Sequence, residues 1–190
     1  MQIAIIGTGK IGGTLGAKFR QAGHEVVYGS RHPDDDGPGG APVVDVGAAI
    51  ASAAVVVFAI PGPAVAAVAA DHGAALGGKV VVDATNRVGQ PVVNNRAEIV
   101  AAAPAAKYVR AFNTLGWENF ADPLPDADLF FAADDDARAT AETLIEAVGL
   151  RPQYLGDADA TATVDSLLPF WFALVKQHGG NRKVALRVVE

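Results

Sequence analysis

The stretch IAIIGTGKIG, residues 3–12, decides the fold, because a run of apolar residues passes directly into three closely spaced glycines. The apolar run Ile3–Ile6 predicts a β-strand buried on both faces, since it shows no alternation between apolar and polar side chains. Beyond the glycines, apolar side chains recur at helical spacing, at Ile11, Leu15 and Phe19. The sequence therefore predicts a strand, a tight turn and a helix in that order.

The three glycines have the G-x-G-x-x-G spacing of a dinucleotide-binding turn. Gly7 permits the tight turn, Gly9 lets the backbone approach a diphosphate, and Gly12 allows the helix to pack closely on the strand. Free N–H groups at the start of the helix attract a diphosphate, and the Thr8 hydroxyl adds a contact. The alternative is a glycine turn that binds no ligand. We predict that the turn binds a dinucleotide through Gly7, Thr8, Gly9, Lys10, Ile11 and Gly12.

Short β-branched runs alternate with helical stretches along most of the chain. This alternation is typical of βαβ units, in which helices cover both faces of a parallel sheet. We predict an α/β fold with one doubly wound, mostly parallel, Rossmann-like sheet, and a single domain over residues 1–190. The further predicted strands are Glu25–Tyr28, Val55–Ala59, Val80–Asp83, Tyr108–Ala111, Leu129–Ala132 and a strand near Arg151–Leu155.

Four other segments have their own signatures. Ser30–Pro42 is rich in Asp, Pro and Gly and is predicted as a surface loop, and Asp135–Val148 is predicted as a helix with an acidic first turn. Thr161–His178 predicts a carboxyl-terminal helix that is apolar on most sides, with Pro169 at its start or at a kink. The tail Lys183–Glu190 alternates enough to be an edge strand or an irregular tail.

The composition excludes several functions. The 190 residues carry a formal net charge of -6 and 15 Lys plus Arg with no basic run, which argues against nucleic acid or an anionic membrane as a partner. The absence of cysteine excludes a disulfide, a thiolate nucleophile and a Cys-based metal centre. The histidines lack the spacing of metal ligands, so we identify no metal site. The sequence also has no recognisable set of catalytic side chains, so we assign none. Met1–Ile6 lacks a basic leader and Ile50–Ala70 is broken by prolines, so we expect a cytoplasmic protein.

The end of the second predicted strand selects the cofactor, because in this fold it lies beside the adenosine ribose. NAD-binding chains place an acidic residue there, whereas this chain has Gly29-Ser30-Arg31-His32. An Arg fork and a Ser hydroxyl can satisfy the oxygens of a 2′-phosphate, so the sequence favours NADP(H). The alternative for Arg31 is an ordinary solvated loop cation, and His32 either contacts the phosphate or adenine or is solvated.

Several motifs along the chain resemble those of one known family. These are Ile5–Gly9, Gly29–Arg31, Asp83–Asn86, Arg110–Gly116 and Leu167–Pro169. Together they are similar to the motifs of the NADPH-dependent reductases of coenzyme F420, a deazaflavin, and the likeness extends over nearly the whole chain. The same nucleotide-binding module is shared with relatives that reduce other acceptors.

The resemblance implies an NADPH site at Thr8, Gly9, Ser30 and Arg31. It also implies that the nicotinamide lies near Ile60, Pro61, Ala84, Asn86 and Asn113. The family often has a Lys a few residues after the Arg, where this chain has Asp34–Asp36. This departure affects the strength of the predicted NADP preference rather than its direction.

The activity that the resemblance implies is hydride transfer between NADPH and coenzyme F420. Both reacting rings bring their own electronics, so the protein has to supply proximity, orientation and a dry, apolar cleft. We expect that cleft between the glycine turn, Ile60–Pro63, Thr85–Arg87 and Asn113–Trp117. Two alternatives are a reductase of the same module that acts on a flavin, a quinone or chelated ferric ion, and a module that binds NADP and a protein partner without turnover.

Six apolar side chains from Leu167 to Leu174, among them Phe170, Trp171 and Phe172, exceed what one face of a helix needs. We expect the aromatic ones to serve an acceptor pocket or a subunit interface, with ordinary core packing as the alternative. By analogy with the resembled reductases, we expect a homodimer.

Overall fold

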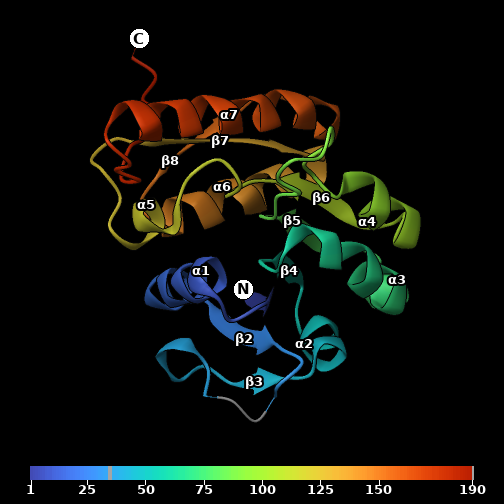
Figure 1. The fold of residues 1–190 in the computed structure, drawn as a ribbon. Coiled ribbons are helices and arrows are strands. Elements are labelled where there is room, and N and C mark those ends of the chain that lie inside the picture. Colours follow the sequence, from blue (N-terminus) through green and yellow to red (C-terminus); the bar gives the residue numbers. More distant parts are fainter. Residues whose placement is uncertain (34–35, 190) are drawn as a thin grey trace.

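The computed structural model describes residues 1–33 and 36–189, and within them eight strands form one sheet (Figure 1). The strands lie in the order β3-β2-β1-β4-β5-β6-β7-β8. Neighbours from β3 to β6 are parallel, whereas β7 is antiparallel to β6 and parallel to β8. This confirms the predicted doubly wound, mostly parallel sheet. The strands are β1 (Gln2–Ile6), β2 (Glu25–Gly29), β3 (Val43–Val44), β4 (Val55–Phe58), β5 (Val80–Asp83), β6 (Lys107–Arg110), β7 (Asp128–Ala133) and β8 (Arg151–Tyr154).

The structure adds two features that the sequence pattern did not predict. The first is the short edge strand β3, which follows the predicted loop Ser30–Pro42; Asp34 and Asp35 of that loop lie outside the described residues. The second is the reversed direction of β7. The chain leaves β6 and enters β7 at the same edge of the sheet, because residues 111–127 contain only one short helix and make no crossover.

Helices cover both faces of the sheet. Buried side chains of α1, α5 and α6 belong to one core cluster, and those of α2, α3 and α4 belong to a second cluster on the opposite face. The last helix, α7, lies along β7 (Figure 1). The helices are α1 (Lys10–Gln21), α2 (Val46–Ser52), α3 (Val65–Leu76), α4 (Arg96–Ala102), α5 (Trp117–Ala121), α6 (Arg138–Ala147) and α7 (Thr161–Gln177).

Helix α7 confirms the predicted carboxyl-terminal helix, and Pro169 lies inside it. Trp171 is buried, and its Nε1–H donates to the Val184 carbonyl oxygen at 2.9 Å, so the core-packing alternative holds for this residue. Phe170 and Phe172 point outward, with 50% and 42% of their surface exposed. The described part of the tail forms a single bridge, between Leu186 and Asp128, rather than a full edge strand. Glu190 lies outside the described residues.

Across the described residues, no helix combines the length and the apolarity needed to cross a membrane.

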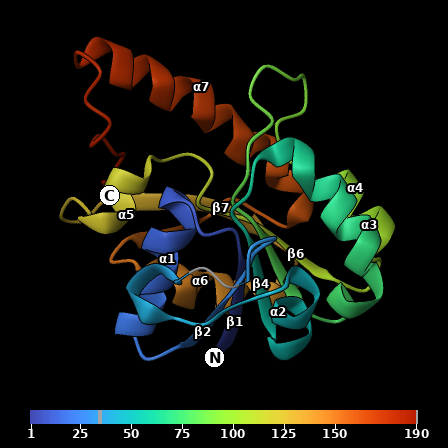
Figure 2. The same ribbon diagram turned by 60° about the horizontal axis from the view of Figure 1, so that its bottom comes forward.

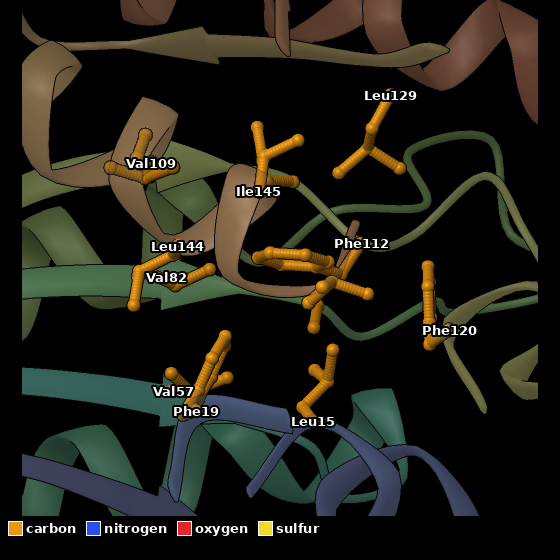
Figure 3. Packing of buried hydrophobic residues seen from close by; sticks show 14 of the residues in the cluster. Leu15, Phe19, Val57, Val82, Val109, Phe112, Phe120, Leu129, Leu144 and Ile145 are labelled. Atoms are coloured by element: carbon orange, nitrogen blue, oxygen red, sulfur yellow. The ribbon is translucent and has the colours of Figure 1, made fainter. Parts of the chain in front are cut away.

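Phe112 lies at the centre of the larger core cluster, in the turn that follows β6 (Figure 3). Its backbone has φ 62°, which is uncommon for a residue with a side chain. The ring is 1% exposed and makes edge contacts with Phe19 and Phe120, at centroid distances of 6.2 and 5.7 Å. Burial of the ring therefore holds the chain in this left-handed turn, which directs residues 113–117 over the sheet.

We predict that Phe112→Ala lowers the free energy of unfolding by about 3–5 kcal/mol, because it leaves a large cavity in a close-packed core. Chemical denaturation followed by circular dichroism measures this change. Val88→Ala is the control, since Val88 is 71% exposed on a loop and its truncation should change stability by no more than about 0.5 kcal/mol. Equal effects of the two substitutions would contradict the assignment of Phe112 as the centre of the core.

Candidate functional site

A cleft of about 650 Å³ opens at the carboxyl ends of β1, β2 and β4. Farther along the sheet, the loop that follows β5, drawn in green in Figure 2, passes beside α7, and its Asn94 side chain donates to Asp165 at 2.7 Å. The glycine turn forms the floor of the cleft, and α3 contributes one wall through Ala64, Ala67 and Val68 at and near its start. From the predicted site residues, the cleft brings together Gly7, Thr8, Gly9, Ser30, Arg31, His32, Ile60 and Pro61.

The glycine turn has the geometry that its spacing predicts. Gly7 has φ 114°, and a Cβ at Gly12 would lie 2.2 Å from the Gly7 carbonyl oxygen, so neither position accepts a side chain. Gly9 is the N-cap of α1, and a Cβ there would meet nothing within 4 Å. No side chain caps this helix and its first turn carries no acidic residue. The start of α1 therefore presents free N–H groups to open space, which suits an anion.

The loop after β2 presents polar groups to the other end of the cleft. The Ser30 Oγ accepts a hydrogen bond from the His32 backbone N–H at 3.0 Å, which fixes the turn that holds Arg31. Arg31 and His32 are exposed at the cleft. The sequence reasoning missed Asp71 and His72, which line the opposite wall. Neither residue belongs to a sequence motif that could have indicated a binding role. In the structure, the backbone of α3 departs from helical geometry at His72, where φ is -124° and ψ is 15°.

Three predicted residues of the glycine motif, Lys10, Ile11 and Gly12, lie outside the lining of this cleft. Ile11 packs against the larger core cluster. The Lys10 ammonium lies over the Trp117 ring at 5.2 Å from its centroid, so it links the start of α1 to the start of α5. This contact brings the glycine turn beside the segment Asn113–Trp117, as the sequence analysis expected.

A second groove, of about 480 Å³, lies between the turn after β4 and the loop after β5. It is lined by Pro63, Arg87, Gln90, Pro91 and Val92, so most of its wall is apolar. The turn that supplies Pro63 also supplies Ala64 to the first cleft, so the two hollows share a wall. Of the four segments between which we expected the acceptor's cleft, this groove includes only Pro63 and Arg87; the glycine turn and Asn113–Trp117 do not line it.

Of the remaining predicted residues, Ala84 is buried in the larger core cluster, whereas Asn86 and Asn113 belong to a polar cluster at the ends of β5 and β6. Its centre is Arg110, whose side chain has no exposed surface. The Nη1 group donates to the carbonyl oxygens of Asp83 and Thr85 at 3.0 and 2.6 Å. The Nε and Nη2 groups both reach Asp165 Oδ1 at 2.7 Å, and Nη2 also donates to Asn86 Oδ1 at 2.9 Å. All five N–H donors of the guanidinium are thereby used.

Asp83 is the second buried charge of the cluster and faces Arg110 at 3.4 Å. It accepts hydrogen bonds from Thr85 Oγ1 at 2.6 Å and from the Asn95 backbone N–H at 2.8 Å. The Tyr108 hydroxyl donates to it at 3.1 Å. Burial raises the pKa of Tyr108 well above its ordinary value, and the charge of Asp83 raises that pKa further, so this hydroxyl keeps its proton.

Asn86 and Asn113 join the two loops that carry them. The Asn86 side chain donates to the Asn113 carbonyl oxygen at 2.8 Å, while its own oxygen accepts from Arg110. The Asn113 amide donates to Asp165 on α7 at 3.2 Å. Sequence reasoning missed Asp165 and the central role of Arg110. The local signal was an arginine between Val109 and Ala111, inside the predicted strand Tyr108–Ala111.

Among the residues that the structure describes, no group of three His, Cys, Asp or Glu side chains is placed to hold a metal ion.

The comparisons with known proteins bear on this site. Residues 2–87 match the model of the family described as NADP oxidoreductase, coenzyme F420-dependent. This segment contains the glycine turn, the Gly29-Ser30-Arg31 motif and the Asp83–Asn86 motif. The resemblance that the sequence predicted is confirmed there.

Solved structures extend the likeness to the whole chain. A protein from Arthrobacter sp. FB24, provisionally described as an F420-dependent NADP-reductase, is 25% identical with a TM-score of 0.86, and each chain is covered over 100% of its length. A hypothetical protein from Sinorhizobium meliloti is 29% identical with a TM-score of 0.71, over 85% of this chain and 87% of that one.

A reductive aminase from Aspergillus terreus, solved with NADPH, shares the fold with a TM-score of 0.72 at 22% identity, over 93% of this chain and 62% of its own. At this identity the likeness shows the fold alone. The family match and the likeness to the Arthrobacter protein support the coarser part of the functional prediction, an NAD(P)-dependent oxidoreductase.

Proposed function

We propose that this chain is a single-domain oxidoreductase that transfers a hydride between NADPH and the deazaflavin coenzyme F420. The observation that carries the proposal is the 650 Å³ cleft, which is lined by both an uncapped helix start and the Ser30–His32 loop. A dinucleotide has anionic groups at corresponding places, the diphosphate and the 2′-phosphate. The open space at Gly9 is consistent with a diphosphate approaching the backbone there.

Each predicted binding residue has a role in this proposal. The turn Gly7–Gly12 holds the diphosphate through backbone N–H groups, and Thr8 adds its hydroxyl. Ser30, Arg31 and His32 hold the 2′-phosphate. Ile60 and Pro61 lie against one side of the nicotinamide. Ala84, together with the Arg110 cluster that contains Asn86 and Asn113, supports the ring from the ends of β5 and β6.

The chemistry of the transfer belongs to the two coenzymes. NADPH would supply a hydride from its nicotinamide C4, and the deazaflavin of F420 would accept that hydride at C5. The reduced deazaflavin would take up one proton from water at a ring nitrogen. The protein's residues bind, orient and exclude water, and we assign no catalytic acid or base to them. The apolar groove beside Pro63 and Val92 gives a flat acceptor ring a place next to the turn that borders the nucleotide cleft.

We predict that NADPH binds more tightly than NADH, because Arg31 and Ser30 bond to the 2′-phosphate. Arg31→Ala removes charge-assisted hydrogen bonds worth roughly 1.5–3 kcal/mol, so the Kd for NADPH should rise about 10- to 150-fold while that for NADH hardly changes. Calorimetric titration with each coenzyme measures both constants. Arg187→Ala, in the exposed tail, should leave both constants unchanged. Equal weakening of both coenzymes by Arg31→Ala would refute the assignment of the phosphate site.

We predict that the purified protein oxidises NADPH only when F420 is present, with loss of absorbance at 340 nm and at the deazaflavin band. Parallel reactions contain a flavin, a quinone or chelated ferric ion in place of F420. Faster oxidation with one of these acceptors would assign the protein to a different reductase of the same module. Tight NADPH binding without oxidation by any acceptor would favour a module that senses NADP without turnover.

We also propose that the protein is a homodimer whose interface includes the outer face of α7, where Phe170 and Phe172 are exposed. Light scattering should give twice the mass of one chain. Phe170→Glu should yield monomers, because it places a charge in an apolar interface, whereas Val92→Glu at an exposed loop position should not. A monomeric native protein would contradict this arrangement.

A further inference from the structure

The polar cluster around Arg110 contains more negative than positive charge. Asp83 and Asp165 both face the single guanidinium, and the exposed fractions of their side chains are 0% and 11%. Among the described residues, Arg110 is the only cation in an ion pair with either carboxylate. One cation and two carboxylates leave one unit of negative charge in a region with little water.

Hydrogen bonds to both carboxylates fit their ionised forms. Asp165 accepts from Arg110, from the Asn113 amide at 3.2 Å and from the Asn94 amide at 2.7 Å. Asp83 accepts from Thr85, from the Asn95 backbone and from the protonated Tyr108 hydroxyl. Every one of these partners donates, and an ionised carboxylate only accepts. Both carboxylates can therefore be ionised at the same time, because neither has to hold a proton to satisfy its partners.

This surplus charge lies directly behind the two loops to which the proposed function assigns the nicotinamide. Asn86 is hydrogen-bonded to Arg110, and Asn113 is hydrogen-bonded to Asp165. One layer of amide side chains therefore separates the proposed ring position from the charged groups. Between charges at this depth, water screens much less than it does at the surface.

We propose that the Asp83–Arg110–Asp165 cluster biases the bound nicotinamide toward its oxidised form, and that Asp165 is the positioning residue that makes the net charge of the cluster negative. The inference rests on the proposed function, because it needs the ring beside Asn86 and Asn113. The nicotinamide ring carries a positive charge only when it is oxidised, so a fixed negative charge stabilises that form and leaves the reduced form almost unaffected. The protein thus favours hydride donation by NADPH over the reverse reaction.

The test compares the two redox forms of the coenzyme in binding, without an acceptor. Asp165→Asn keeps the size of the side chain and removes one negative charge. The ratio of the Kd for NADP⁺ to the Kd for NADPH should rise about tenfold, from the loss of one charge at short range in a medium of intermediate dielectric constant. Calorimetric titration of each form gives the ratio.

Asp159→Asn is the matched control for the charge change. Asp159 lies just before α7, and its side chain is 82% exposed in an ion pair with Arg96, so solvent screens it. This variant should keep the ratio within about twofold of the native value. A purely structural role of Asp165 would lower the melting temperature and weaken both forms equally. A folded Asp165→Asn protein with an unchanged ratio would therefore overturn the proposal.

A second substitution keeps the test decisive if Asp165→Asn does not fold. Asn86→Asp adds a negative charge next to Arg110 and should lower the same ratio, the opposite direction. An unchanged or raised ratio would count against the proposal. Failure of the native protein to bind either NADP⁺ or NADPH would instead refute the proposed function, so the two failures are distinguishable.

Discussion

Arg110 carries a full positive charge on a side chain that water does not reach, so each of its N–H groups needs an acceptor within the protein. The acceptors come from the end of β5, from the loop after it and from α7. Removal of any one of them would leave a buried donor unpaired, which is costly. The guanidinium therefore fixes three parts of the chain relative to one another at the edge of the sheet where the cleft opens.

The two parts of the proposed coenzyme site depend on different physical devices. At β1 and β2 the backbone itself forms the binding surface, and glycines are needed because side chains would collide with the turn. At the ends of β5 and β6 the polar side chains Asn86 and Asn113 are held in place by the hydrogen bonds of the Arg110 cluster. The first device is local in sequence, and the second joins residues that are far apart along the chain.

This difference explains how much the sequence could predict. The strand, turn and helix at residues 3–12 follow from local spacing, and so does the doubly wound sheet. The partnership of Arg110 with Asp165 spans 55 residues and leaves no periodic signal in either segment. The reversed β7 and the left-handed turn at Phe112 were missed for the same reason, because both depend on packing rather than on neighbouring residue types. Asp71 and His72 were missed because they lie on α3, where no sequence motif indicates which side chains line the cleft.

The contact between Lys10 and Trp117 gives the protein an internal optical probe. The chain has 2 tryptophans, and Trp171 is buried with its N–H bonded to the backbone of the tail. The other indole ring lies under an ammonium group that belongs to the glycine turn itself. Indole emission is sensitive to a nearby charge, so movement of Lys10 when an anion arrives at the turn would change the fluorescence of Trp117 alone. Occupancy of the turn can thus be followed in the native chain without any added label.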